Sequence, residues 1–183
     1  MRTQSASKKS TSLKAVAFRL VLGVGLGVGF GVSSADPSQD VLQAARTVIG
    51  QTAFPSLITI DSGGQPKARV VDAFPPDEDF VVWVATRPST RKVSEIRGNS
   101  KVTLHYFSDD HRNYVSIMGE ATLIEDTKTK QTMRRASDTA KLYPEFPKDY
   151  LLLRIQPQRL EGVLPGYRGD PLTWQPVGVD FPH

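Results

Sequence analysis

The sequence predicts a mainly β fold, an antiparallel β-barrel with peripheral α-helices. Most of its apolar segments are short and rich in β-branched and aromatic residues, as strands are. Turn sequences, rather than long amphipathic helices, separate most of these segments. Hairpins need only short connections, whereas parallel strands need crossovers of about a dozen residues or more. The pattern therefore favours a barrel over a doubly wound parallel sheet.

A helix and a hairpin open the globular part of the chain. Asp36 is a suitable N-cap and Pro37 suits the first helical position, and apolar residues then recur at helical spacing through Gln51. Strands at 54–60 and 67–74 follow, joined by the turn sequence Asp-Ser-Gly-Gly. These signals predict one helix followed by a two-stranded ribbon.

The later elements alternate strands with two short helices. The stretch 80–86 is almost wholly apolar, which predicts a central strand. Gly119 lies in the middle of a long strand, where it indicates a bend or a bulge. The last helix is expected to begin after Asp126 as its N-cap and to turn Ala136 and Ala140 inward. The full set comprises strands at 80–86, 101–107, 113–125, 150–156 and 159–164, and helices at 89–98 and 126–141.

The first 35 residues have the features of a secretory signal peptide. A basic start precedes the apolar stretch 15–32, which is interrupted by Arg19 and followed by small residues that end at Ala35. Cleavage after Ala35 would leave 36–183 as a single domain. The alternatives are an uncleaved membrane anchor, for which the apolar run is short, and a misassigned start codon. We expect an exported protein, periplasmic or extracellular, with no stable membrane span after processing.

Composition excludes several classes of function. The chain of 183 residues has no cysteine, which excludes a disulfide scaffold, a thiolate metal site and a cysteine nucleophile. Its three histidines show no metal-binding spacing, so no metal site is predicted. The formal charge of +4 comes from the first 35 residues, which contain basic but no acidic side chains. The nearly neutral remainder argues against a nucleic-acid partner.

The best candidate for a functional site is the turn between the strand 80–86 and the next helix. Thr86 and Thr90 bring hydroxyl groups to this turn. Arg91 and Lys92 bring positive charge to the first helical turn, where the helix dipole disfavours cations. A bound anion such as a phosphate would explain their presence, and Arg69 on an earlier strand is a candidate further ligand. A solvated basic turn and a surface arginine are the alternatives.

Several motifs together carry a family resemblance. In chain order they are Arg69-Val70-Val71, Thr86 with Thr90-Arg91-Lys92, Asn99-Ser100-Lys101-Val102-Thr103-Leu104, and the strand 114–124. This arrangement resembles the FMN-binding split barrels of the pyridoxamine 5′-phosphate oxidase-like superfamily, in particular its short, general-stress-type members. The resemblance covers about Phe54 to Arg159 and implies a split β-barrel of the FMN-binding type.

The resemblance also implies a cofactor, a site and an assembly. The cofactor would be FMN, and the protein would be a homodimer with FMN at the interface. The three cations and Thr90 would hold the FMN phosphate, while Thr86 and the backbone of two valines would line the ribityl chain and the ring. The full set of expected FMN-binding residues is Arg69, Val70, Val71, Thr86, Thr90, Arg91 and Lys92.

The chain departs from the pyridoxamine phosphate oxidases themselves. Phe74 stands in place of a lysine, Tyr114 in place of a glutamine, and no Arg-x-His motif follows Arg159. We therefore expect a different FMN-dependent oxidoreductase, with an unknown small-molecule substrate and no catalytic residue identified. The alternatives are a non-enzymatic carrier of flavin, haem or another tetrapyrrole, with His105 as a candidate haem ligand, and a deazaflavin-dependent reductase of the same fold.

Signal-peptide cleavage predicts that the mature protein begins at Asp36. The intact mass of the protein isolated from its native host should equal that of residues 36–183, because signal peptidase cleaves after a small residue such as Ala35. The protein should also be soluble. A full-length chain in the membrane fraction would instead identify the apolar stretch as an uncleaved anchor.

Overall fold

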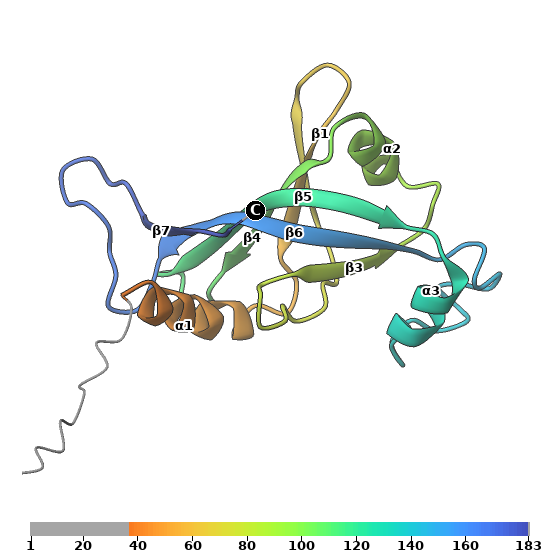
Figure 1. Cartoon of the computed structure of the whole chain (residues 1–183), viewed down its shortest axis with the longest axis horizontal. Helices are drawn as coiled ribbons and strands as arrows, with labels where there is room; N and C mark the ends of the chain where they lie inside the picture. The colour runs from red at the N-terminus through yellow and green to blue at the C-terminus, as the bar shows by residue number, and fades with distance from the viewer. Residues whose placement is uncertain (1–36, 183) are drawn as a thin grey trace, which may run out of the picture. The chain divides into compact units, whose positions relative to one another are not determined.

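A computed structural model describes residues 37–182, so the expected signal peptide and the N-cap at Asp36 lie outside the described residues. The strands form an antiparallel sheet in the order β2-β1-β4-β5-β6-β3, with β7 beside β6 (Figure 1). The strands are β1 Ser56–Ile60, β2 Pro66–Val70, β3 Val82–Thr86, β4 Lys101–Phe107, β5 Tyr114–Ile124, β6 Leu151–Val163 and β7 Val177–Asp180. The helices are α1 Pro37–Gly50, α2 Arg91–Gly98 and α3 Thr127–Met133. This is the mainly β class that the short connections predicted.

A short contact closes the sheet into a split barrel. β2 and β3 stand at opposite ends of the strand order. Just beyond β2, Ala73 forms an isolated antiparallel bridge with Val84, and the Phe74 amide donates to the carbonyl of Trp83 at 2.8 Å. β3 is therefore buried but terminal in the strand order, and the prediction that it is a central strand was wrong. The strand predicted at 67–74 likewise ends early, because the chain leaves β1 to reach β3.

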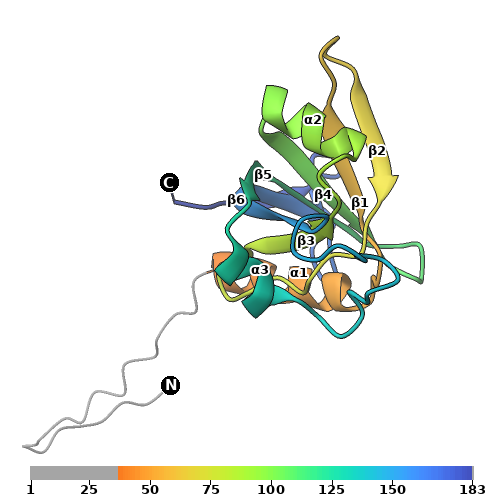
Figure 2. The ribbon, with the colours of Figure 1, turned by 90° about the vertical axis from the view of Figure 1, so that its right-hand side faces the viewer.

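The two faces of the sheet divide the apolar side chains. Buried residues alternate along β1, β3, β4 and β5, which is the pattern of strands with one face inside. α1 contacts β4, β5 and β7 and adds its apolar face to the main core. A second, smaller cluster centres on Tyr143, Tyr150 and Leu152. α2 lies beside β1 in both views (Figures 1 and 2).

The predicted helix at 126–141 is wrong beyond its first turns. Asp126 does cap α3, because its side chain accepts a hydrogen bond from the Thr129 amide at 2.8 Å. The helix ends at Met133, however, and Ala136 and Ala140 are exposed rather than inward. The side chain of Asp138 is buried in the turns that follow and cannot remain without partners there. The chain therefore forms turns around this carboxylate instead of continuing the helix.

The two strands predicted at 150–156 and 159–164 form one long strand, β6. The register between β5 and β6 shifts between Met118 and Gly119, which confirms the bulge expected at Gly119. A Cβ at Gly119 would lie 2.0 Å from the carbonyl oxygen of Gln156, so only glycine lets the two strands approach this closely. β7 was not predicted, because its four residues lie in a tail rich in proline and glycine.

No helix within residues 37–182 is long and apolar enough to cross a membrane.

Gly119→Ala should lower the free energy of unfolding by about 1–3 kcal/mol, because the new methyl group collides with backbone that cannot move independently. Gly98→Ala is the matched control, since a Cβ there has no atom within 4 Å, and it should be neutral or slightly stabilising. Urea denaturation of the two variants measures both effects. Equal stabilities would show that the strand contact at Gly119 is not tight in solution.

Candidate functional site: a cation cluster under α2

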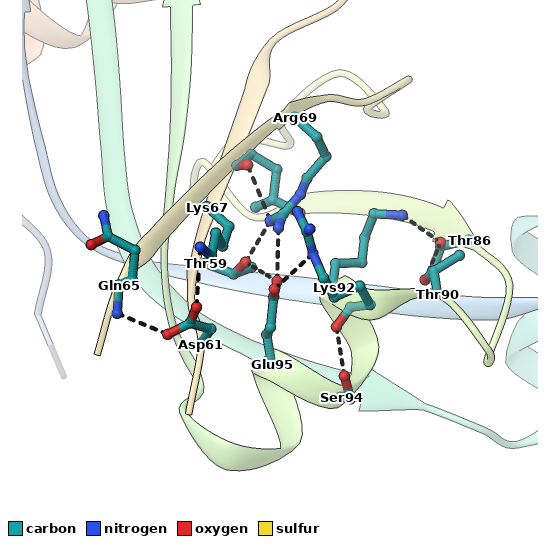
Figure 3. A network of polar contacts seen from close by, with 12 residues as sticks. Thr59, Asp61, Gln65, Lys67, Arg69, Thr86, Thr90, Lys92, Ser94 and Glu95 are labelled. Atoms are coloured by element: carbon teal, nitrogen blue, oxygen red, sulfur yellow. Dashed lines mark hydrogen bonds and ion pairs between the residues drawn. The ribbon is translucent and has the colours of Figure 1, made fainter. Parts of the chain in front are cut away.

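The residues predicted to bind an anion come together beside α2 (Figure 3). Arg69 extends from β2, and Thr86 ends β3. The other two cations, Arg91 and Lys92, belong to the first turn of α2. β1 makes this convergence possible, because it pairs with β2 on one side and also contacts α2. Segments that are far apart in the sequence thus supply one polar cluster.

A buried glutamate lies at the centre of the cluster. The Glu95 side chain is only 4% exposed, and its Oε2 accepts hydrogen bonds from Thr59 Oγ1 and, at 2.7 Å, from Arg69 Nη2. Arg69 also donates to Thr59 Oγ1, so the three side chains form a closed triangle. Burial alone would raise the pKa of Glu95, but the bonds from Thr59 and Arg69 outweigh it and hold the pKa below the ordinary value. Glu95 is therefore ionised at neutral pH.

Arg91 also faces this carboxylate. Its Nε lies 3.0 Å from Glu95 Oε1, one helical turn away, although the Arg91 side chain is 66% exposed. The contact lacks the alignment of a hydrogen bond, because Oε1 has no hydrogen-bond partner among the described residues. Arg91 therefore does not by itself require a bound anion, since Glu95 already offsets its unfavourable position at the start of the helix.

Lys92 is the cation without an acidic partner. Its Nζ donates to Thr86 Oγ1 at 3.0 Å, and Thr86 Oγ1 lies 3.2 Å from Thr90 Oγ1. Within the described part of the chain, no ion pair involves Lys92. Burial lowers the pKa of Lys92, the neighbouring charge of Arg69 lowers it further, and the charge of Glu95 offsets these effects only in part. An anion placed here would relieve both effects.

The charges and the helix terminus together suit a doubly charged anion. Three cations surround one carboxylate, which leaves an excess of two positive charges. Thr90 is the N-cap of α2, but its hydroxyl bonds the Arg87 carbonyl at 2.9 Å and does not cap the helix. The first-turn amides therefore lack a side-chain cap. Such amides readily donate hydrogen bonds to a bound anion. A phosphate monoester, with a charge of about −1.5 to −2 near pH 7, matches this excess.

The remaining predicted residues lie on either side of the cluster. Val70 is 67% exposed at the end of the edge strand β2. Val71 is buried, and its amide is already bonded to the Pro55 carbonyl at 3.0 Å. Arg87, part of the same basic turn, points elsewhere and donates to the Leu142 carbonyl through Nε and Nη2. Val70 is thus the valine that a bound molecule can reach by its side chain.

A second ionic network ties the segment after α3 to the site. Arg135 makes a two-pronged ion pair with Asp72, at 3.0 and 3.1 Å, and also donates to the buried carboxylate of Asp138. Tyr150 Oη donates to Asp138 at 2.9 Å. Burial would raise the pKa of Asp138, but the bonds from Arg135 outweigh it and lower that pKa. Asp72 directly follows the two valines, so this network holds the end of that segment.

The sequence reasoning missed Glu95, Thr59 and this second network. The spacing of Arg91 and Glu95 was the available signal for the first, because residues four apart on a helix are neighbours. Thr59 carried no signal, since its role depends on the pairing of β1 with β2. Arg135 and Asp72 are far apart in the sequence, and only the fold joins them.

The candidate haem ligand His105 is half-buried on β4. Its Nδ1 lies 3.0 Å from Ser116 Oγ on β5, and burial lowers its pKa. The neighbouring Tyr106 points to the opposite face, into the core. The side chains of His105 and Tyr106 therefore lie on opposite faces of the sheet and do not line one site.

Comparison with known proteins identifies relatives of the chain. The family model described as Pyridoxamine 5′-phosphate oxidase matches residues 41–164, more than half of the chain. The pyridoxine/pyridoxamine 5′-phosphate oxidase of Pseudoalteromonas translucida (strain TAC 125) is 36% identical over 63 residues, which span 34% of this chain and only 29% of that enzyme. General Stress Protein 26 from Bacillus anthracis strain Sterne is 26% identical, covers 67% of this chain and 92% of its own, and superposes with a TM-score of 0.55.

Structures with the same fold are named for different ligands. An FMN-binding protein related to pyridoxamine 5′-phosphate oxidase from Nostoc punctiforme PCC 73102 is 14% identical, covers 82% of this chain and 99% of its own, with a TM-score of 0.53. A heme binding protein from Mycobacterium smegmatis is 17% identical (66% and 52% covered, TM-score 0.53), and an F420 reductase is 15% identical (63% and 94% covered, TM-score 0.51). At these identities the likeness establishes the split-barrel fold alone.

Glu95→Gln should destabilise the protein by about 3 kcal/mol or more at pH 7, because it leaves Arg69 without its buried partner. The folded-state pKa of Glu95 is lowered, so its contribution is fully present above pH 4.5, the ordinary glutamate value, and is lost as pH falls through the lower folded value. The difference in unfolding free energy between wild type and Glu95→Gln should therefore shrink in acid. Chemical denaturation at several pH values measures it.

Glu125→Gln is the matched control for this experiment. Glu125 pairs with Arg97 at the other end of α2, but both side chains are more than half exposed. Such pairs contribute about 0–1 kcal/mol. A loss at Glu95 no larger than the loss at Glu125 would contradict a structural role for the buried carboxylate.

Proposed function

Because the chain belongs to the pyridoxamine 5′-phosphate oxidase family, we propose that it binds FMN, with the phosphate on the cation cluster beside α2. The observation that carries the proposal is Lys92, a half-buried cation that has hydroxyl neighbours but no acidic partner among residues 37–182. The excess of two positive charges fits a phosphate monoester better than a singly charged group. The FMN-binding name of one structural neighbour also supports this choice.

The residues fit FMN in defined roles. Lys92 and Arg91 would contact the phosphate, and Arg69 would supply charge while remaining bonded to Glu95. Thr86 and Thr90 would add hydroxyl groups beside it. The backbone of Val70, at the end of the edge strand β2, would line the ring, while its side chain points to the face opposite Arg69. These contacts would bind and orient the cofactor.

We propose that the protein is an oxidoreductase with a small-molecule substrate that remains to be identified. FMN, when bound, supplies hydride or electron transfer itself. The chain would therefore need to hold the flavin and shape its surroundings rather than supply a nucleophile. Phe74 stands where the pyridoxamine phosphate oxidases have a lysine, and its ring centre lies 4.1 Å from the guanidinium carbon of Arg135. A packed aromatic ring cannot replace the charge of that lysine, which supports a reaction other than pyridoxamine phosphate oxidation.

We propose a homodimer in which the second copy covers the flavin. The outer face of β1, β2, β4 and β5 carries apolar side chains, including Val70 at 67% and Phe107 at 48% exposure. By strand alternation and register, Ile58, Tyr114 and Met118 share this face and are only partly buried. Several apolar side chains on one exposed face support a protein interface. Val70 directly follows Arg69 in β2, although the two side chains point to opposite faces, so a partner on this face would lie at the strand edge next to the proposed ring site.

We propose export, on the basis of the leader sequence at 1–35. A chain exported unfolded would acquire FMN outside the cytoplasm. A haem or deazaflavin protein of the same fold is the competing function, supported by the names of two neighbours. The absorption spectrum and mass of the molecule that copurifies distinguish these cases, because flavin, haem and deazaflavin absorb differently.

Lys92→Ala should weaken FMN binding by about ten- to more than a hundredfold, because it removes a charge-assisted contact worth about 1.5–3 kcal/mol. Arg91→Ala should cost less, since Arg91 already shares its charge with Glu95. Fluorescence titration of the apoprotein measures both affinities.

Riboflavin and Arg97→Ala are the controls for this titration. Riboflavin lacks the phosphate and should bind wild type and all variants almost equally. Arg97 lies on the same helix but in its last turn, 54% exposed, and its removal should leave FMN affinity unchanged. FMN binding to Lys92→Ala as tight as to wild type would contradict the phosphate assignment.

Val70→Asp should dissociate the proposed dimer, because it places a charge in the exposed apolar face. Light scattering should report the mass of two chains for the wild type and of one for the variant. Leu172→Asp is the matched control, since Leu172 is 89% exposed but lies in the β6–β7 connection. A wild-type protein that is monomeric with FMN bound would refute the dimer.

A further inference from the structure

A second site candidate lies away from the cation cluster, between the end of α1 and the connection that follows β2. A pocket of about 370 Å³ opens there, and none of the cluster residues lines it. This volume falls within the range of small-molecule sites in proteins. Most of its lining is apolar and includes Ile49, Ala53, Pro55, Ala73, Pro75 and Pro76.

Tyr106 provides the pocket with a polar group that lacks a protein partner among the described residues. Its side chain points into the barrel from β4 and is only 2% exposed. Among residues 37–182, no protein atom forms a hydrogen bond with the Tyr106 hydroxyl. A buried hydroxyl without a partner is costly, and buried polar groups in folded proteins are rarely left so. Burial also raises the pKa of Tyr106, so the phenol keeps its proton and remains a donor.

Arg46 holds the wall of the pocket in place. Its Nη2 donates to the carbonyls of Asp77 and Glu78, at 2.8 and 2.7 Å. Its guanidinium also lies 4.0 Å from the centre of the Phe80 ring. These contacts join α1 to the β2–β3 connection beside the pocket, which Arg46 also lines. The pocket is therefore bounded by fixed elements and does not need a conformational change to form.

We propose that this pocket binds a small, mostly apolar carbonyl compound, such as an aryl ketone or a quinone, whose oxygen accepts a hydrogen bond from Tyr106. The apolar walls would take the hydrocarbon part, and the Tyr106 hydroxyl would donate to one acceptor. The other polar side chains of the lining already have protein acceptors, because Thr52 donates to the Phe107 carbonyl and Arg46 to the carbonyls of Asp77 and Glu78. No acidic residue lines the pocket, so an amine would find no counter-charge. The inference stands whether or not the protein binds FMN, because it uses none of the proposed FMN residues.

A matched pair of probes tests the proposal. Acetophenone and ethylbenzene are similar in size and shape, but only acetophenone carries a carbonyl acceptor. NMR titration of the isotopically labelled protein should show both probes shifting the amides of Ala53, Ala73 and Tyr106. Acetophenone should bind about three- to tenfold more tightly than ethylbenzene.

Variants separate the hydrogen bond from the pocket. Tyr106→Phe should abolish the preference for acetophenone while ethylbenzene binds as before or more tightly. Tyr167→Phe, a partly buried tyrosine outside this pocket, should keep the full preference. Ala53→Trp should weaken both probes at least tenfold, because Ala53 is exposed at the mouth and a large ring there would block entry without disturbing the core.

The outcomes decide the proposal directly. Loss of the preference in Tyr106→Phe alone, with Ala53→Trp blocking both probes, supports it. Equal affinities of the two probes for wild type, an unchanged preference in Tyr106→Phe, or the absence of binding by either probe would each overturn it. Thermal denaturation of each variant confirms that altered binding does not reflect loss of the fold.

Discussion

The ion pair between Glu95 and Arg69 joins a helix to an edge strand across the strand between them. Glu95 belongs to α2, Thr59 to β1 and Arg69 to β2, and all three side chains bond one another. A carboxylate this buried is tolerated only when it is paired and hydrogen-bonded. Because the Glu95 carboxylate must keep these partners, it fixes the direction of the Arg69 side chain and the position of α2 over β1. The spacing of Lys92 from the hydroxyl groups at the end of β3 follows from that placement.

The same carboxylate sets the charge available to a ligand. Arg69 and Arg91 are shared with Glu95, so an incoming phosphate would share them too and would gain less than full attraction from each. Lys92 makes no ion pair with Glu95, and the charge of Glu95 only partly offsets the effects that lower the pKa of Lys92. The effects of removing these cations will consequently not be additive, because each removal changes the charge that the others must balance. Glu95 thus keeps the cations ordered before binding and lowers the affinity that they would have alone.

Local pattern was enough to predict most of the fold. Alternation located β4 and β5, Gly119 located the bulge, and Asp126 located the start of α3. The errors arose where tertiary contacts override local preference. The apolar pattern of β3 could not show that the strand is terminal in the sheet, and helical spacing after Met133 could not show that Asp138 would be buried with Arg135 and Tyr150.

The residues of the candidate site likewise fall into those that local sequence predicts and those that only the fold brings into place. Lys92 and Thr86 were predictable because a basic turn after a buried strand is a local signal, and the structure brings them within 3.0 Å. Glu95 was harder to predict, because an acidic residue on a short helix is usually solvated. Its burial follows from the position of α2 over β1, which is a property of the sheet order and not of the helix sequence.

The closure of the barrel explains why the segment after α3 matters to the site. β2 and β3 meet only through the bridge between Ala73 and Val84, so little backbone pairing holds the end of β2 near β3. Arg135 reinforces that closure from outside, by its paired contact with Asp72 and by packing over Phe74. Because Arg87 binds the same segment through the Leu142 carbonyl, both flanks of the proposed flavin site are fastened to one loop. The positions of the residues that would contact the flavin ring therefore depend on side-chain contacts from this loop as well as on the hydrogen bonds of the sheet.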